Sequence, residues 1–192
     1  MKKMSEEYYP WGGDFTAVNP HGTVAVVLLN IDFKPDEDVA IYGRLKTENI
    51  GIEKIVANVI SNPHIRFVIL CGEDIRGHRS GRSFVCLHRN GINENHRIID
   101  APGAIPFIEN LNEEAIQRFQ NQVEIIDLIG ETNTDVLHEK IKEVISHHVE
   151  SFGEPFIAIQ LKQSKKEEFS DKRALHSKII VNYMGNVRKR EE

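Results

Sequence analysis

Two predominantly apolar runs rich in β-branched residues, at positions 23–29 and 65–70, flank a stretch whose apolar residues recur at helical spacing. A continuous apolar run of this length is typical of a strand that is covered on both faces. Between the runs, the apolar positions from 52 to 60 fall on one side of a helix, which Asn49 can cap and Pro63 can end. A strand, a helix and a second strand in this order predict a right-handed crossover and a parallel sheet with helices on its faces.

The rest of the chain repeats this alternation of strand and helix. We expect further helices at 80–88, 112–120 and 134–145, opened by Ser80, Asn112 and Thr134, and further strands at 97–100, 123–129 and 156–161. The sequence therefore predicts an α/β fold with a Rossmann-like, three-layer architecture and a mostly parallel sheet of about five or six strands.

The composition changes near the end of the last predicted strand. Residues 162–192 hold nine Lys and Arg against five Asp and Glu, with few apolar positions. We therefore expect a polar extension at 162–192, a Rossmann-like domain at 23–161 and an N-terminal segment at 1–22.

Charge and hydropathy exclude several classes of protein. The formal net charge of -5 gives no general attraction for nucleic acid, and the body of the chain has no basic stretch interleaved with aromatic residues. The amino terminus lacks an apolar run of signal-peptide length, and no segment approaches the about 20 apolar residues that span a bilayer. We expect a soluble, cytoplasmic protein with no membrane anchor and no nucleic-acid partner.

Three loops are candidates for a ligand site, because loops that leave the carboxyl ends of strands converge at one edge of such a sheet. Residues 43–49 present a hydroxyl, an amide and main-chain N–H groups, which either cap the following helix or contact a ligand. Residues 72–83 place His78 between two glycines, as either a metal ligand or a hydrogen-bonded loop residue. Residues 101–110 form an apolar loop with prolines, which either covers a hydrophobic ligand face or packs on a neighbouring helix.

The motifs of several common enzyme classes are missing from the chain. There is no Gly-x-x-x-x-Gly-Lys-Ser/Thr and no Gly-x-Gly-x-x-Gly after a predicted strand, which disfavours a standard nucleotide site. The sequence also lacks a Gly-x-Ser-x-Gly elbow and a His-Glu-x-x-His pair, so that a serine hydrolase and a metallohydrolase are disfavoured as well.

A specific pattern of segments runs through residues 8–130. It includes Tyr-Pro-Trp-Gly-Gly-Asp at 9–14, Gly-Ala-Ile-Pro at 103–106, and further matches at 45–54, 58–63, 71–72, 77–78, 108–110, 118–120 and 122–125. With these segments the chain resembles the MtrA family, the corrinoid-carrying subunits of tetrahydromethanopterin S-methyltransferase, which is a methyl-transfer complex of methanogens.

The resemblance implies a cobamide as cofactor, cobalamin or a related cobalt corrinoid. It implies that the cobalt accepts a methyl group from methyl-tetrahydromethanopterin and passes it to a thiol such as coenzyme M, with partner subunits or separate methyltransferases. His78 matches the family histidine at the lower axial side of cobalt, where it would act as the catalytic and metal-facing residue, directly or through water. The implied cofactor-binding residues are Leu45, Thr47, Glu48, Asn49, Gly72, Glu73, Gly77, His78, Ser80, Gly81, Ser83, Gly103, Ala104, Ile105 and Pro106.

An axial histidine needs a partner for its other ring nitrogen, because that hydrogen bond fixes the tautomer and the basicity of the ring. In the cobalamin-binding signature Asp-x-His-x-x-Gly, this partner is an aspartate two residues upstream, a position that Arg76 occupies here. A supporting carboxylate would therefore come from Glu73, Asp74 or the loop that bears Glu48.

The chain departs from the family pattern at its end and near the histidine. The membrane-bound family member ends in a hydrophobic anchor, whereas this chain ends in a polar segment, which argues against direct participation in sodium pumping. Arg79 and Arg82 stand where an uncharged residue and a glutamine are expected; they either grip the cofactor or face solvent. Besides a methyl carrier, the sequence leaves open a corrinoid storage or methylation-sensing module and, less well supported, an α/β enzyme for a phosphorylated metabolite.

Overall fold

The computed structural model describes residues 8–158, 179–181 and 187–189. The chain divides into two compact units, Met1–Leu161 and Lys162–Glu192. In the second unit, β6 (Ile179–Val181) and β7 (Val187–Lys189) form an antiparallel pair. The first unit contains β1 (Phe15–Ala17), β2 (Val24–Leu28), β3 (Ile41–Arg44), α1 (Ile50–Ser61), β4 (Phe67–Gly72), α2 (Ser80–Asn90), α3 (Glu113–Gln122), β5 (Glu124–Ile129) and α4 (Thr134–Ile145).

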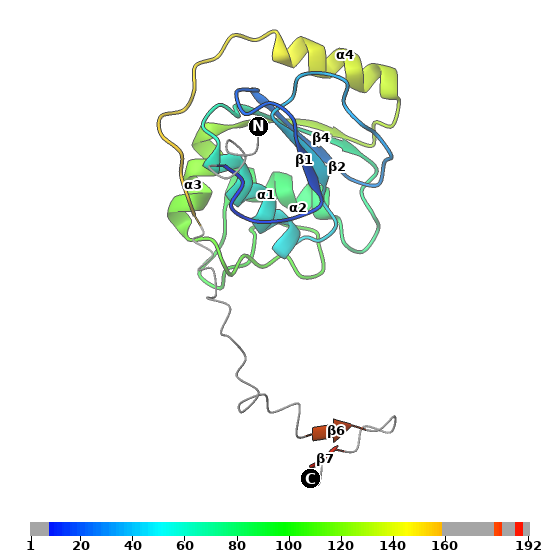
Figure 1. The fold of residues 1–192 in the computed structure, drawn as a ribbon, viewed down its shortest axis with the longest axis vertical. Coiled ribbons are helices and arrows are strands. Elements are labelled where there is room, and N and C mark those ends of the chain that lie inside the picture. The colour runs from blue at the N-terminus through cyan, green and yellow to red at the C-terminus, as the bar shows by residue number, and fades with distance from the viewer. Residues whose placement is uncertain (1–7, 159–178, 182–186, 190–192) are drawn as a thin grey trace. The chain divides into compact units, whose positions relative to one another are not determined.

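The first unit is built on one sheet with the strand order β1-β3-β2-β4-β5 (Figure 1). The pairs of β2 with β3, β2 with β4, and β4 with β5 are parallel, whereas β1 runs antiparallel to β3. Every residue of β2 and β4 is buried, as expected for central strands with both faces covered. The α/β class and the mostly parallel sheet are confirmed.

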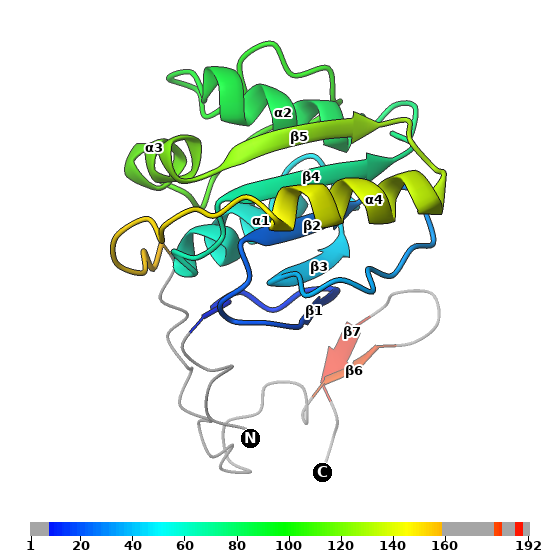
Figure 2. The ribbon, with the colours of Figure 1, turned by 90° about the horizontal axis from the view of Figure 1, so that it is seen from above.

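The helices form a layer on each face of the sheet (Figure 2). Alternate residues of β2 and β4, such as Val27 and Leu70, pack with α1, α2 and α3, while their neighbours, such as Val26 and Ile69, pack with α4. Because side chains alternate across a strand, the two apolar runs supply both cores, which gives the predicted three layers.

The ends of the helices follow local capping chemistry. The side-chain oxygens of Asn49, Asn112 and Asn133 accept hydrogen bonds from main-chain N–H groups at the starts of α1, α3 and α4. In α2 the predicted cap is wrong, since Ser80 is the first helical residue and the preceding Arg79 has a left-handed backbone with φ 42°. The carboxylate of Asp74 caps this helix instead, accepting from the N–H groups of Gly81 at 3.0 Å and Arg82 at 2.9 Å.

The order of the strands reverses between β2 and β4. The connection after β2 packs on the α4 side through Phe33 and Val39, whereas the connection after β4 leads to α2 on the other face. Adjacent strands whose connections leave to opposite faces open a crevice at their carboxyl ends, the usual ligand site of such sheets.

One predicted strand is wrong, the described part of another forms no strand, and β1, β3, β6 and β7 were not predicted. Residues 97–100 form only isolated bridges, Ile92 with Ile98 and Arg97 with Phe107, because this segment folds back on its own neighbours. The part of 156–161 that is described, 156–158, forms no strand; the N–H of Phe156 donates instead to the carbonyl of Ile60 at the end of α1. Short, partly exposed β1 and β3 complete the sheet in their place.

None of the helices that the structure describes has the length and apolarity needed to cross a bilayer. A cytoplasmic location remains a prediction from the sequence.

Candidate functional site

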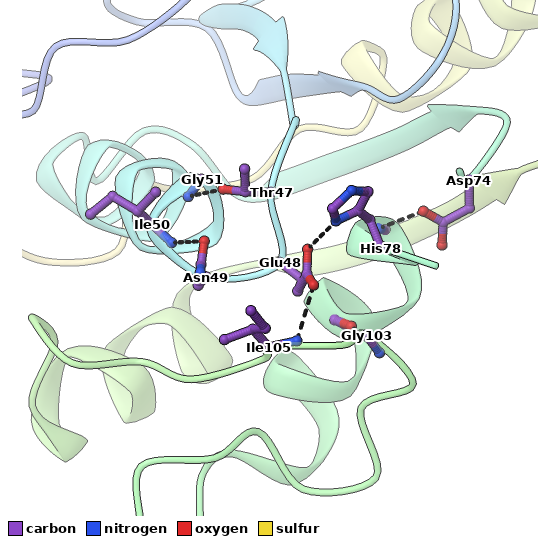
Figure 3. A network of polar contacts seen from close by, with 11 residues as sticks. Thr47, Glu48, Asn49, Ile50, Gly51, Asp74, His78, Gly103 and Ile105 are labelled. Carbon is purple, nitrogen blue, oxygen red and sulfur yellow. Dashed lines mark hydrogen bonds and ion pairs between the residues drawn. The ribbon is translucent and has the colours of Figure 1, made fainter. Parts of the chain in front are cut away.

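Three segments meet beside the carboxyl ends of β3 and β4, and polar contacts join them (Figure 3). The first, at 45–49, leads from β3 to the start of α1; the second, at 73–79, leads from β4 to α2; the third is the loop at 101–106. The sheet topology therefore brings together the three loops that the sequence analysis selected.

His78 and Glu48 form the central contact of this site. Nδ1 of His78 lies 3.1 Å from Oε2 of Glu48, and the N–H of Ile105 donates to Oε1 of Glu48 at 3.1 Å. The Glu48 side chain is only 4% exposed, whereas that of His78 is 58% exposed. A buried carboxylate thus holds one edge of an imidazole whose remaining surface faces solvent, and it ties the loop of Ile105 to the same point.

The protonation of Glu48 decides how this contact is made. Burial is the largest influence and favours the neutral acid, but hydrogen bonds from the N–H groups of Glu48 and Ile105, together with His78, outweigh it and lower the pKa of the Glu48 carboxyl. Glu48 is therefore ionised at neutral pH and only accepts hydrogen bonds. We infer that Nδ1 of His78 carries the hydrogen, so that the neutral ring presents the lone pair of Nε2.

We expect acid to remove the contribution of Glu48 to folding. A carboxyl whose pKa is lower in the folded state stabilises the fold above its unfolded pKa, near the ordinary value of 4.5, and this contribution disappears as the pH falls through the folded pKa. The unfolding free energy of Glu48→Gln should therefore lie about 1 kcal/mol below the original at neutral pH, and the gap should close below pH 4.5. Urea denaturation of both proteins across this range measures it; a constant gap would contradict the ionised carboxylate.

Gly103 is where the third loop comes closest to the other two. A Cβ atom at this position would lie 2.7 Å from the His78 carbonyl oxygen, 2.8 Å from Oγ of Ser83 and 2.9 Å from Cγ of Glu48. Its N–H donates to Oγ of Ser83 at 3.2 Å. Only glycine permits this approach, and through it the third loop contacts Ser83 and the segments that carry His78 and Glu48.

Several predicted cofactor residues stabilise the loops through hydrogen bonds or burial. Thr47 and Asn49 accept from the N–H groups of Gly51 and Ile50 at 2.9 Å and 2.8 Å, so both hydrogen-bond to the first residues of α1. Leu45, Gly72, Ser80, Gly81, Ser83 and Pro106 are buried, whereas Glu73, Gly77, Ala104 and Ile105 are exposed beside His78 in the sequence or in space.

The structure shows which of the three candidate carboxylates contacts His78. Asp74 is occupied by the start of α2, and Glu73 is exposed and contacts the connection after β2 only through its backbone bridge to Asn30. Glu48 is the carboxylate that reaches His78.

Three exposed isoleucines lie on the same loops, and the sequence analysis missed two of them. Ile50 at the start of α1 is 40% exposed, Ile75 after β4 is 52% exposed, and Ile105 is 59% exposed. Ile50 and Ile105 also line a small hollow with Asn49, Glu53 and Phe107. Large apolar side chains on polar loops are the one signal that would have identified Ile50 and Ile75 from the sequence. The three isoleucines add exposed apolar area to the segments that meet at Glu48 and His78.

Cationic side chains border this surface. Arg76, Arg79 and Arg82 are exposed, and none of them forms an ion pair within the residues that the structure describes. The described segments also contain no group of three or more His, Cys, Asp or Glu side chains that could hold a metal ion. His78 can thus offer a single nitrogen to a metal whose other ligands come from elsewhere.

Comparison with known proteins gives one family. The family model of MtrA, the A component of tetrahydromethanopterin S-methyltransferase, matches residues 1–169. The chain is 44% identical over 172 residues to the first MtrA-type subunit of this methyltransferase from Methanothermobacter thermautotrophicus, covering 87% of this chain and 72% of that one. It is 41% identical over 186 residues to the second such subunit from Methanobrevibacter ruminantium, covering 93% of this chain and 96% of that one.

Proposed function

Because this chain belongs to the MtrA family of tetrahydromethanopterin S-methyltransferase subunits, we propose that it is a corrinoid-binding methyl carrier. In this proposal a bound cobamide would supply the cobalt chemistry that moves a methyl group from methyl-tetrahydromethanopterin to a thiol such as coenzyme M. Partner subunits or separate methyltransferases would deliver and remove the methyl group.

The contact between His78 and Glu48 is the observation that best supports the proposal. A bound cobamide would bring cobalt ligands of its own, so the protein would need to supply at most one nitrogen. The described residues offer such a donor, an exposed imidazole whose far nitrogen is held by a buried, ionised carboxylate. Hydrogen bonding of this kind orients a metal-ligating histidine and raises its basicity. The donor set therefore fits a corrinoid.

The surface around His78 supports the same ligand class. A corrin ring is broad and has apolar faces, and Ile50, Ile75 and Ile105 expose apolar area at the rim of the site. Exposed arginines at 76, 79 and 82 could bind the amide oxygens or the phosphate of the cofactor's periphery.

Each part of the site would have a separate task. A bound corrinoid supplies the cobalt chemistry, and the protein supplies position and electrostatics. Nε2 of His78 would face the lower side of the metal, directly or through water. Glu48 would hold the proton on Nδ1 and keep the ring oriented, while Gly103 and Ser83 fix the third loop against both residues. The isoleucines would exclude water from the covered face of the ring.

We expect His78→Ala to bind cobalamin more weakly and to change its spectrum. The protein is reconstituted with hydroxocobalamin and passed through gel filtration, and the visible spectrum of the protein peak is recorded. Loss of the axial nitrogen should alter the cobalt(III) bands and lower retention of the pigment about tenfold or more. His148→Ala, at an exposed histidine outside the site, is the matched control. An unchanged spectrum in His78→Ala would refute the axial role of this residue.

A storage or methylation-sensing module would bind the same cofactor, so reconstitution alone does not separate it from a carrier. A second experiment separates them: the reduced, cobalamin-loaded protein is incubated with methyl-tetrahydromethanopterin and purified partner subunits. A carrier becomes methylated at a rate that exceeds that of free cobalamin and then loses the methyl group to coenzyme M. A storage module does neither.

A further inference from the structure

Two histidines lie close together before the amino ends of β2 and β4, whereas His78 lies beyond the carboxyl end of β4. His21 precedes β2, and His64 precedes β4. Nδ1 of His21 lies 3.4 Å from Nε2 of His64, and the two rings are 5.0 Å apart between centroids with 77° between their planes. The rings are therefore neither stacked nor coplanar, and one nitrogen of each lies close to the other ring.

Buried and short polar contacts fix the two turns that carry these rings. Asn62 is fully buried; its Nδ2 donates to the Pro20 carbonyl at 3.0 Å, and its Oδ1 accepts from the N–H of His64 at 3.0 Å. One side chain thus spans both turns. The N–H of His21 also donates to Oδ1 of Asn19 at 2.9 Å. Because both backbones are held, the spacing of the imidazoles is built into the fold rather than left to two free surface side chains.

The separation of the two nitrogens is compatible with two kinds of contact. A hydrogen bond between ring nitrogens is short, near 3.0 Å at its best, and 3.4 Å is close to the limit. Two nitrogens bound to one tetrahedral zinc ion at about 2.0–2.1 Å lie about 3.3–3.4 Å apart. The observed separation has this second value.

We propose that His21 and His64 form a binding site for a divalent transition-metal ion of the kind that imidazole prefers, with zinc as the representative ion. The two histidines supply two nitrogens. Since the described residues hold no cluster of three or more ligating side chains, water completes the coordination. The ion would join the turn before β2 to the turn before β4.

The test measures zinc binding by the whole protein, loaded with Zn²⁺ alone after removal of metals with a chelator. Titration calorimetry gives the dissociation constant, and thermal unfolding with and without Zn²⁺ gives a second readout, because a ligand that binds only the folded state raises Tm. His21→Ala and His64→Ala are each expected to weaken binding about tenfold or more, which corresponds to about 1.4 kcal/mol, and to abolish the rise in Tm. His21 is exposed, so His21→Ala should fold normally.

One histidine variant outside the pair makes the test specific. His148→Ala should bind Zn²⁺ as the original protein does, because this exposed ring does not belong to the site. The proposal is overturned if Zn²⁺ fails to stabilise the original protein, or if His21→Ala and His64→Ala retain its full affinity. It stands or falls independently of the corrinoid proposal, since no cobalamin is present in the experiment.

Discussion

Gly103→Ala is expected to lose most of its affinity for cobalamin while the sheet stays folded. The new Cβ would overlap with the His78 carbonyl oxygen, Oγ of Ser83 and Cγ of Glu48, all at less than 3.0 Å. A backbone carbonyl and two side chains that are themselves buried have no free direction in which to move. Relief of such an overlap costs about 1–3 kcal/mol.

The overlap would be relieved at the lowest cost in free energy if the loop at 101–106 moved outward. This movement would separate the loop from Glu48 and His78. Ile105 would then withdraw its N–H from Glu48, and the ring of His78 would lose its fixed support. If the whole cost appears in binding, cobalamin affinity falls about 5- to 150-fold. Equilibrium dialysis against hydroxocobalamin measures this loss, and urea denaturation measures the accompanying change in stability.

Gly12→Ala is the matched control, because a Cβ at this exposed position would meet no atom within 4 Å. It should bind cobalamin as the original protein does. Normal binding by Gly103→Ala would show that the tight contact among the three loops is not needed for the ligand.

The sequence correctly predicted the helices and strands that are determined by their own residues. The apolar runs that become β2 and β4 need no partner to be recognised, and α1 is evident from its spacing and from the cap at Asn49. Of the three loops of the site, the one at 72–83 followed from this pattern, because it leaves the strand predicted at 65–70. The same rule selects His78 without reference to any relative. The loops at 43–49 and 101–110 were selected for their composition, since the strand before the first was missed and the strand predicted before the second does not form.

The errors arose where distant contacts decide the local structure. The strand β3 has only four residues, one of them glycine, and is a strand because β1 and β2 pair with its two edges. Residues 97–100 have a strand-like composition but pair only through isolated bridges with neighbouring segments. The pairing of His78 with Glu48 joins residues 30 positions apart, and Asp74, the nearer carboxylate, is taken by α2. No periodicity in the sequence encodes which of two carboxylates a helix end will occupy.

Glu53→Ala is expected to cause a large loss of stability and to release the loop at 101–110. The Glu53 carboxylate is 2% exposed and accepts three hydrogen bonds from residues 109 and 110. Two come from the main-chain N–H groups of Glu109 and Asn110, and the third comes from Nδ2 of Asn110 at 2.7 Å. This carboxylate is the polar anchor that ties the far end of the third loop to α1.

The size of the effect follows from the charge and burial of the anchor. Hydrogen bonds to a charged group contribute about 1.5–3 kcal/mol each, but the exposed donors at 109 and 110 recover part of this from water once the carboxylate is gone. We therefore expect Glu53→Ala to lower the unfolding free energy by about 3 kcal/mol. Glu53→Gln keeps the shape of the side chain but loses its charge. Its unfolding free energy should therefore lie between those of Glu53→Ala and the original protein.

Hydrogen exchange separates a local effect from a global one. Since Glu53 holds the loop that carries Gly103 and Ile105, amides of residues 101–110 should exchange faster in Glu53→Ala, while those of β2 and β4 change only with overall stability. Cobalamin affinity should fall in parallel with the loop protection. Glu94→Ala, which removes an exposed carboxylate from the segment before this loop, should change neither quantity. If Glu53→Ala kept the exchange pattern of the loop, the ordering of the site would have to come from Gly103 and Glu48 alone.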